Sequence, residues 1–341
     1  MFKFIFIMLV WVMSSQSYAY NMQDMLDKHL LPTYENLAEQ TAELNQTANS
    51  YCVNPSSAGL ESLKAKTRDT FLAWQAAQHI RFGPVLAFSR DRRFDFWPDK
   101  RGTIRKQLYE LVNGSALEAE DFDITHKSVA VQGLSALEQL LNPKSDDAEV
   151  NCFLVASITQ NLHTMANDLA SEWASSSTPF VDLFLNPGED NYIYRSESEL
   201  GGELINTLYT QLEFMVTRKL DLPLGSSMGK ARGKLSEGWR SHSSLAALSA
   251  NLNACHEFYR YSFAPQLKAN PLDEKIESAF KQVQATLEEI DIPLSQAVSD
   301  AEKRLLVVRL KQELTQLKNL VASDVADILG IALGFNSLDG D

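Results

Sequence analysis

Segments with the apolar period of an α-helix follow one another along most of the chain, and this pattern limits the possible folds more than any other feature. Between residues 59 and 81, apolar side chains recur at steps of three, four or seven residues, and Gly83 and Pro84 then end the helix. Strand signals are scarce. Because long helices with short connections are typical of antiparallel bundles, the sequence predicts an all-α protein. Further helices are expected at residues 22–51, 129–142, 149–175, 197–219, 244–261, 272–291 and 299–330.

The most loop-like stretch near the middle of the chain marks the expected joint between two domains. Residues 175–199 carry Pro179, Pro187 and Gly188 between two helical segments. With about four long helices on each side, we predict two four-helix-bundle domains, and one continuous bundle is the alternative. The predicted parts are a first bundle at residues 20–176, a connector at 177–196 and a second bundle at 197–341.

The first residues have the composition of a secretory signal peptide. Lys3 precedes an apolar stretch at residues 4–12, and Ser17-Tyr18-Ala19 offers the small residues that a signal peptidase needs. We expect cleavage after Ala19, which makes residues 1–19 a signal peptide and the protein periplasmic; an uncleaved anchor is the alternative. No cysteine lies near this site, so a lipid anchor is not expected, and no later segment has the length of a transmembrane helix.

The charge of the chain argues against one class of partner. The formal net charge is −13, and removal of Lys3 with the signal peptide leaves −14. Nucleic-acid phosphates would repel a chain this acidic, so no nucleic-acid partner is expected.

Three cysteines predict one disulfide and one free thiol in an oxidising compartment. Spacing alone does not choose the pair. Cys52 and Cys152 both fall at the ends of expected helices in the first half, whereas Cys255 lies in the middle of a helix in the second half. We therefore predict the pair Cys52–Cys152. No C-x-x-C or His/Cys cluster suggests structural zinc.

A single glutamate stands inside the apolar run VAVQGLSALEQLLN at residues 129–142. On one continuous helix, Glu138 falls within the apolar arc with Ser135 at its edge, while Gln132 and Gln139 face solvent. A carboxylate that faces a core is costly unless a cation pairs with it. We therefore expect Glu138 to be buried and paired with an arginine. The apolar arc consists of Val131, Leu134, Leu137, Leu140 and Leu141.

Two basic segments stand out from the acidic background. Residues 81–106 carry eight Lys or Arg against three Asp, and residues 218–240 carry six against two acids. Cations gathered in loops of an acidic protein are candidate contacts for an anion, although any one arginine could instead pair with a nearby acid. We expect the two segments to face each other across the domain joint. Their candidate ligand-binding residues are Arg81, Trp97, Arg101, Trp239 and Arg240.

Motifs for three kinds of catalysis are missing or incomplete. Neither H-E-x-x-H nor H-x-x-E occurs, so the sequence has no helix-borne zinc site of that type. The stretch GLSAL at residues 133–137 resembles a serine-hydrolase elbow but lacks the second glycine and lies in a helical pattern. There is no P-loop and no dinucleotide fingerprint. His79 is expected to be a packed or exposed histidine and not a ligand.

Several strings, in order along the chain, resemble those of imelysin-like proteins. They are QHIRFGP (78–84), FWPDKR (96–101), AVQGLSALEQLL (130–141), EGWRSHSSL (237–245) and GFNSLDGD (334–341). The resemblance implies an all-helical periplasmic protein of two similar four-helix bundles, with a functional site at their interface. The family was first classed as metallopeptidases and is now more often connected with bacterial iron uptake or homeostasis.

The motif of that family, G-x-H-x-x-E, falls on Gly133, Ser135 and Glu138, so a serine replaces the histidine. Serine is a much weaker metal ligand than imidazole, but its hydroxyl can hydrogen-bond a carboxylate, a guanidinium or an anion. We expect no tight metal here, with Glu138 the one possible ligand; the resemblance alone suggests iron or another metal as a cofactor.

Three hypotheses follow for the function. The first is a non-catalytic binding or accessory protein connected with iron, which holds a small ligand or anion between the bundles and works with a periplasmic or outer-membrane protein. The second is an imelysin-type metallopeptidase, which Ser135 disfavours. The third is a structural or interaction protein in which Glu138 and an arginine form an internal clasp.

Overall fold

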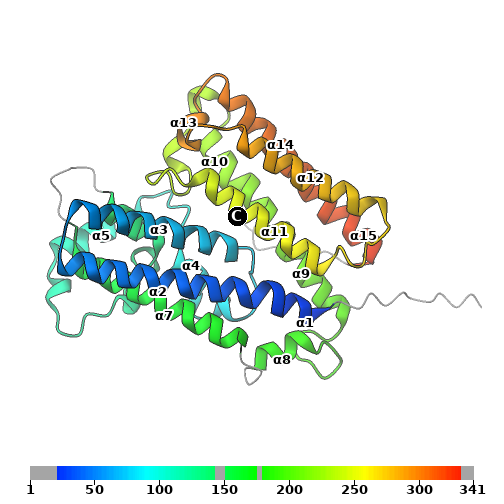
Figure 1. The fold of residues 1–341 in the computed structure, drawn as a ribbon, viewed down its shortest axis with the longest axis horizontal. Coiled ribbons are helices and arrows are strands. Elements are labelled where there is room, and N and C mark those ends of the chain that lie inside the picture. Colours follow the sequence, from blue (N-terminus) through cyan, green and yellow to red (C-terminus); the bar gives the residue numbers. More distant parts are fainter. Residues whose placement is uncertain (1–20, 143–149, 175–178, 332–341) are drawn as a thin grey trace, which may run out of the picture.

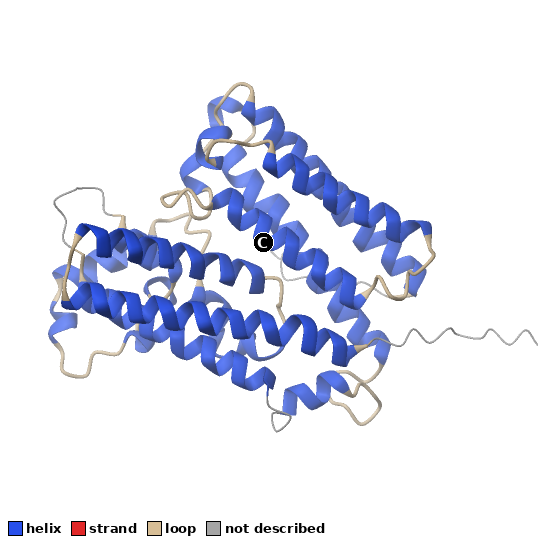
Figure 2. Ribbon diagram, in the orientation of Figure 1, coloured by secondary structure: helices blue, strands red, loops and turns tan. Residues whose placement is uncertain are grey.

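The computed structural model describes residues 21–142, 150–174 and 179–331, and every regular element in these ranges is helical (Figures 1 and 2). The all-α prediction is therefore confirmed. The signal-peptide prediction for residues 1–19 and the resemblance at 334–341 lie outside the described residues. Within the described ranges, no helix combines the length and the apolar character needed to cross a membrane.

The first bundle is built on three long helices: α2 (Leu31–Val53), α3 (Ser57–Ala77) and α7 (Cys152–Ala174). Helix α2 packs along both α3 and α7, and the three lie side by side in Figure 1. Two shorter helices, α5 (Thr103–Asn113) and α6 (Leu134–Leu141), take the place of a long fourth helix. The other helices of this half are α1 (Met22–Met25), a π-helical turn (Leu26–Leu30) and α4 (Arg90–Phe94).

Four longer helices form the second bundle: α9 (Glu197–Phe214), α11 (Ser244–Ser262), α12 (Pro271–Glu288) and α14 (Lys303–Asn319). Helix α14 packs against α12 and α9, and α11 packs against α9 and α12. The remaining elements are α10 (Asp221–Leu224), α13 (Leu294–Ala297), α15 (Ala326–Leu329) and π-helical turns at Met215–Leu220 and Leu320–Val325.

Helices α3 and α11 form the main seam between the bundles, and they run beside each other in Figure 1. Short 3₁₀ segments occur in several of the connections between the helices. The 3₁₀ segments are Gly83–Ser89, Ser115–Glu118, Ile124–His126, Val129–Val131, Met228–Lys230 and Gly233–Leu235.

The chain turns sharply after α3, as Gly83 and Pro84 predict. Gly83 has φ +70°, and a Cβ atom there would lie 2.5 Å from the ring of Phe180. Glycine is therefore required both for the backbone conformation and for the close packing. Phe180 belongs to α8 (Pro179–Leu185), which lies within the predicted connector, and its neighbour Phe184 packs against Phe82. This part of the connector is thus packed onto the first bundle.

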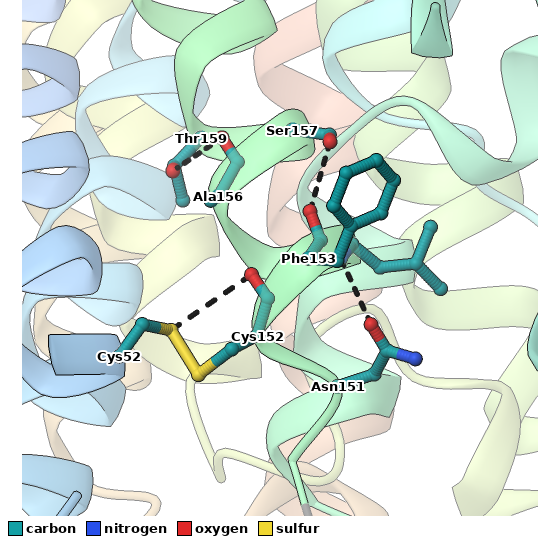
Figure 3. Close-up of a disulfide and its surroundings, with 8 residues drawn as sticks. Cys52, Asn151, Cys152, Phe153, Ala156, Ser157 and Thr159 are labelled. Carbon is teal, nitrogen blue, oxygen red and sulfur yellow. Dashed lines mark hydrogen bonds between the residues drawn. A yellow bond between two sulfur atoms is a disulfide. The ribbon is translucent and has the colours of Figure 1, made fainter. Parts of the chain in front are cut away.

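One disulfide joins the last turn of α2 to the first turn of α7 (Figure 3). It links Cys52 to Cys152, whose Cα atoms lie 5.5 Å apart across a sequence separation of 100 residues. Cys255 is free and buried on α11. The predicted pairing is confirmed, and the bond holds the end of α2 against the start of α7.

Candidate functional site

Helix α6, which carries the candidate site, begins at Leu134, so the prediction of one helix over residues 129–142 was wrong. Residues Val129–Val131 form a separate 3₁₀ turn. Gly133 then passes directly against the preceding segment, where an added Cβ would meet the carbonyl oxygens of Arg93 and Phe94 at 2.3 Å. This close approach ends the first turn and sets the direction of α6.

Gln132 was predicted to face solvent, and it is instead buried. Its side-chain carbonyl accepts a hydrogen bond from Arg93 Nε at 2.7 Å, and its amide donates to the carbonyl of Lys127 at 2.6 Å. A buried amide that is fully hydrogen-bonded costs little. The polar side chain of Gln132 therefore stabilises the turn before α6 by hydrogen bonds, and its polarity does not indicate exposure to solvent.

The first turn of α6 places Ser135 against Asp95. The backbone N–H of Ser135 donates to Asp95 Oδ1 at 3.2 Å, and the Ser135 hydroxyl donates to the same oxygen. Asp95 is positioned because Phe94, its neighbour, stacks on Trp74 of α3 with ring centroids 4.6 Å apart. Packing inside the first bundle thus fixes the carboxyl group that accepts the hydrogen bonds of Ser135.

One turn later, Glu138 reaches across to the second bundle. Its Oε1 accepts hydrogen bonds from Ser241 N at 3.0 Å and Ser241 Oγ at 2.7 Å. Its Oε2 lies 3.8 Å from Arg240 Nη1, so the expected arginine partner is present in a loose pair. The Glu138 side chain is 14% exposed, so the prediction of a buried carboxylate was too strong.

Ser135 and Glu138 line a pocket of about 680 Å³, a volume that includes its open mouth. Helix α3 forms one wall and α6 the opposite wall, while Gly238 and Ser241 of the second bundle close one side. The pocket therefore lies where the two bundles meet. Its lining residues are Glu61, Lys64, Thr67, Arg68, Phe71, Leu134, Ser135, Glu138, Leu141, Asn142, Gly238 and Ser241.

Behind this pocket a buried polar network joins α3 to the second bundle. Lys219 Nζ lies 2.6 Å from Glu237 Oε2, and both side chains are almost fully buried, at 2% and 3% exposure. Gln75 connects the pair to α3, because its carbonyl accepts a hydrogen bond from Lys219 and its amide donates to Glu237 Oε1 at 3.1 Å. Asn251 of α11 donates to the Gln75 backbone carbonyl at 2.6 Å.

Asp95 lies between the pocket and this network. Burial and the neighbouring Glu237 carboxylate raise the pKa of Asp95 well above its ordinary value. A protonated Asp95 still accepts from Ser135 and can share its proton with Glu237. With Asp95 protonated, Lys219 and Glu237 remain as a buried ion pair.

The two basic segments do meet across the joint, as predicted, but through their acids. Asp95 belongs to the first segment and Glu237 to the second, and the two carboxyl groups interact directly. Lys219, which the sequence placed in a basic segment, is the buried counter-ion of this contact. One cation of these segments therefore neutralises a carboxylate at the interface between the two bundles.

Five predicted site residues lie outside the pocket lining. Arg81 stacks over Phe214 of α9 at 4.9 Å and donates to Gln211 at 3.3 Å. Trp97 packs edge-on against the same Phe214 ring. Arg101 is exposed, and Trp239 supports Arg240 by a cation–π contact of 4.5 Å. Arg81 and Trp97 thus contact the second bundle, and Arg240 is connected to the pocket through its pair with Glu138.

Sequence reasoning missed several residues of this site. Asp95 stands between two aromatic residues in FDFWPD, and Lys219 follows apolar residues at helical steps in α9 and its π turn. Both patterns place a charged group on a packed face, which is the signal that could have identified them. The residues concerned are Gln75, Asp95, Lys219, Glu237, Ser241 and Asn251.

Comparison with known proteins agrees with this fold. The family model described as Imelysin, which carries a peptidase label, matches residues 30–321. The chain belongs to the imelysin family. An iron-regulated protein A from Synechococcus elongatus is 23% identical over 262 residues, which cover 75% of this chain and 68% of that protein.

Two solved structures share the imelysin fold. An imelysin-like protein from Psychrobacter arcticum superposes with a TM-score of 0.76 at 21% identity, covering 92% of this chain and 96% of that one. A protein described as an iron-regulated protein A precursor, from Parabacteroides distasonis, gives a TM-score of 0.72 at 15% identity, covering 89% and 94%. At these identities the likeness concerns the fold.

The residues at the imelysin motif do not fit a tightly bound metal. Glu138 Oε1 already accepts two hydrogen bonds, Oε2 faces a guanidinium, and the Ser135 hydroxyl donates to Asp95. Among the described residues, no group of three or more His, Cys, Asp or Glu side chains could hold a metal ion. A buried histidine pair, His29 and His79, lies on other elements, with its Nε2 atoms 2.7 Å apart. We therefore derive no metal-dependent step.

The raised pKa of Asp95 predicts a pH dependence of stability. In the folded protein Asp95 keeps its proton at pH values where the unfolded chain has lost it, so unfolding releases a proton and stability falls as pH rises above about 4. The loss is at most about 1.4 kcal/mol per pH unit and stops at the folded pKa. Asp95→Asn mimics the protonated group, so the variant should match the wild type at pH 4 and exceed it increasingly towards pH 8.

Urea unfolding at several pH values would measure this difference. The pH 4 measurement is the internal control, because both side chains are then neutral in the folded state. A variant several kcal/mol less stable than the wild type at pH 8 would mean that Asp95 is ionised and needed as an anion.

Proposed function

We propose that this imelysin-family chain is an exported, non-catalytic binding or accessory protein connected with iron uptake or homeostasis, and that it holds a small ligand in the Glu138 pocket. The observation that carries the proposal is the position of Glu138. Ser241 of the second bundle orients this carboxylate by two hydrogen bonds, yet the side chain also lines an open pocket where the two bundles meet. Pockets that combine apolar walls with a few oriented polar groups are the usual form of a ligand site.

A peptidase is the weaker alternative. Hydrolysis by Ser135 would need a base that takes its proton, and the hydroxyl instead donates to Asp95, a carboxyl group for which burial and the Glu237 carboxylate favour the protonated form, which cannot take that proton. Zinc-dependent hydrolysis would need imidazole or several carboxylates as ligands. The donor set at the motif favours binding over hydrolysis.

A purely structural clasp is also less well supported. The Glu138–Arg240 contact is 3.8 Å long, with both side chains partly exposed, at 14% and 24%. Exposed pairs of this kind contribute about 0–1 kcal/mol. The buried Lys219–Glu237 pair is better placed to hold the bundles together, which leaves Glu138 available for a ligand.

Export and the link to iron rest on the sequence and on the names of relatives. Residues 1–19 have the composition of a signal peptide, and one structural relative is described as a precursor. Two relatives are described as iron-regulated proteins. We extend these properties to this chain as part of the proposal, together with a periplasmic or outer-membrane protein as its partner.

Native mass spectrometry of full-length protein expressed with its leader and collected from the periplasm would test the proposal. We expect one retained small molecule and no stoichiometric zinc or iron. The variant Ser135→His restores the imidazole of the family motif and should gain metal affinity, since imidazole is a far stronger ligand than a hydroxyl. Stoichiometric metal in the wild-type protein that is lost in Glu138→Gln would contradict the non-metal site.

A further inference from the structure

One group of residues in the Glu138 pocket presents acceptors of hydrogen bonds. The Ser135 hydroxyl donates its hydrogen bond to Asp95, so towards the pocket it can act only as an acceptor. The amide nitrogen of Asn142 donates to the backbone carbonyl of Glu138 at 2.9 Å, which leaves its carbonyl oxygen free. Glu138 Oε2 has no partner closer than the guanidinium at 3.8 Å. Three oxygens therefore lack a donor.

A second feature of the pocket is an unpaired cation. Arg68 is an exposed residue of α3 that lines the pocket, and among the described residues no carboxylate oxygen lies within 4.0 Å of its guanidinium. Lys64, one turn earlier on the same helix, is held by Glu61 at 3.0 Å. Arg68 is thus the unpaired positive charge of the pocket, and a guanidinium binds carboxylates well.

Apolar side chains line the pocket beside these polar groups. Phe71 comes from α3, and Leu134 and Leu141 come from opposite ends of α6. They favour a short hydrocarbon body by burial of apolar surface. The pocket is therefore complementary to a molecule that combines a carboxylate, a hydrogen-bond donor and an apolar body.

We propose that the ligand of this pocket is a small amphoteric acid, which directs a carboxylate to Arg68 and a hydrogen-bond donor, either an ammonium or a hydroxyl group, to Glu138 and Ser135. The inference rests on the proposed function, since it names the class of ligand for the same site. A simple anion would donate no hydrogen bond to the oxygens of Ser135, Glu138 and Asn142, and a simple amine would make no ion pair with Arg68. A ligand that uses both features carries both groups.

Four probes with the same branched carbon skeleton separate the contributions of the two polar groups. Leucine carries a carboxylate and an ammonium, leucic acid a carboxylate and a hydroxyl, isocaproate the carboxylate alone, and isoamylamine the ammonium alone. Isothermal titration calorimetry on the mature full-length protein should show leucine, leucic acid or both binding at least about tenfold more tightly than isocaproate and isoamylamine. The better of the first two identifies the donor as ammonium or hydroxyl.

Two variants then test which side chain binds which polar group of the ligand. Arg68→Gln should reduce the affinity for the tighter probe to that for isoamylamine, and Glu138→Gln should reduce it to that for isocaproate. Lys66→Gln is the matched control, because it removes a cation of the same helix that does not line the pocket and is paired with Glu43 at 2.6 Å, and it should change affinity little. Circular dichroism of each variant checks that the fold is intact.

Equal binding of isocaproate and the amphoteric probes would overturn the proposal, and so would binding of none of the four. Native mass spectrometry separates this failure from failure of the proposed function. A retained molecule that lacks either a carboxylate or a donor contradicts the ligand class and leaves the binding function standing. An empty pocket in protein from the periplasm, together with no probe binding, contradicts both.

Discussion

Replacing Glu237 with glutamine is expected to lower the free energy of unfolding by about 3–5 kcal/mol, because the variant leaves a buried ammonium without its carboxylate. Lys219 is 2% exposed and lies 2.6 Å from Glu237, and burial already lowers its pKa. Urea unfolding at pH 7 would measure the loss as a lower midpoint at an unchanged m-value. The matched control is Asp221→Asn, which removes the carboxylate of the exposed pair with Lys311 and should cost less than about 1 kcal/mol.

A second substitution, at Asp95, tests the same ion pair. In the Glu237→Gln variant, Asp95 is the remaining carboxyl group near Lys219, and its ionised form can neutralise the Lys219 ammonium. Adding Asp95→Asn to Glu237→Gln should therefore destabilise further, although Asp95→Asn alone does not destabilise the protein. We expect a coupling of about 1–3 kcal/mol, as for residues of one network. Strict additivity of the two substitutions would mean that the carboxyl groups do not share the same cation.

Removing the disulfide is expected to have the second-largest effect. The double variant Cys52→Ser, Cys152→Ser should lose about 2–4 kcal/mol, because the bond closes a separation of 100 residues in the unfolded chain and holds α2 against α7. Thermal unfolding with and without dithiothreitol would measure it. Reduced wild-type protein should melt with the double variant, which itself should not respond to the reductant. A wild-type melting temperature that reductant leaves unchanged would show that the bond contributes little.

The long helices could be predicted because their determinants are local. In α3 the apolar side chains recur with the helical period, and Gly83 ends the segment for a reason visible in the sequence. The disulfide was predictable for a similar reason, since Cys52 and Cys152 fall at the ends of two such helices. Each inference needed only a few neighbouring residues.

The site depends on contacts between distant parts of the chain, and these were harder to predict. Gln132 appeared to face solvent because the apolar period continued through Gly133, whereas the backbone of Arg93 and Phe94 prevents that continuation. Lys219 is paired with Gln75, 144 positions earlier, and nothing next to either residue indicates the contact. Glu138 was recognisable as an acid in an apolar arc, but its hydrogen bonds to Ser241 were not.

The central claim is that Glu138 serves ligand binding more than stability, and Glu138→Gln tests it most directly. The substitution keeps the shape and the acceptor for Ser241 but removes the charge that faces Arg240. Wild-type and variant protein from the periplasm should be compared for ligand occupancy by native mass spectrometry and, after removal of the ligand, for stability by urea unfolding. We predict that the variant retains no ligand and loses less than about 1 kcal/mol of stability. Full occupancy together with a loss of about 3–5 kcal/mol would show instead that Glu138 is a structural clasp.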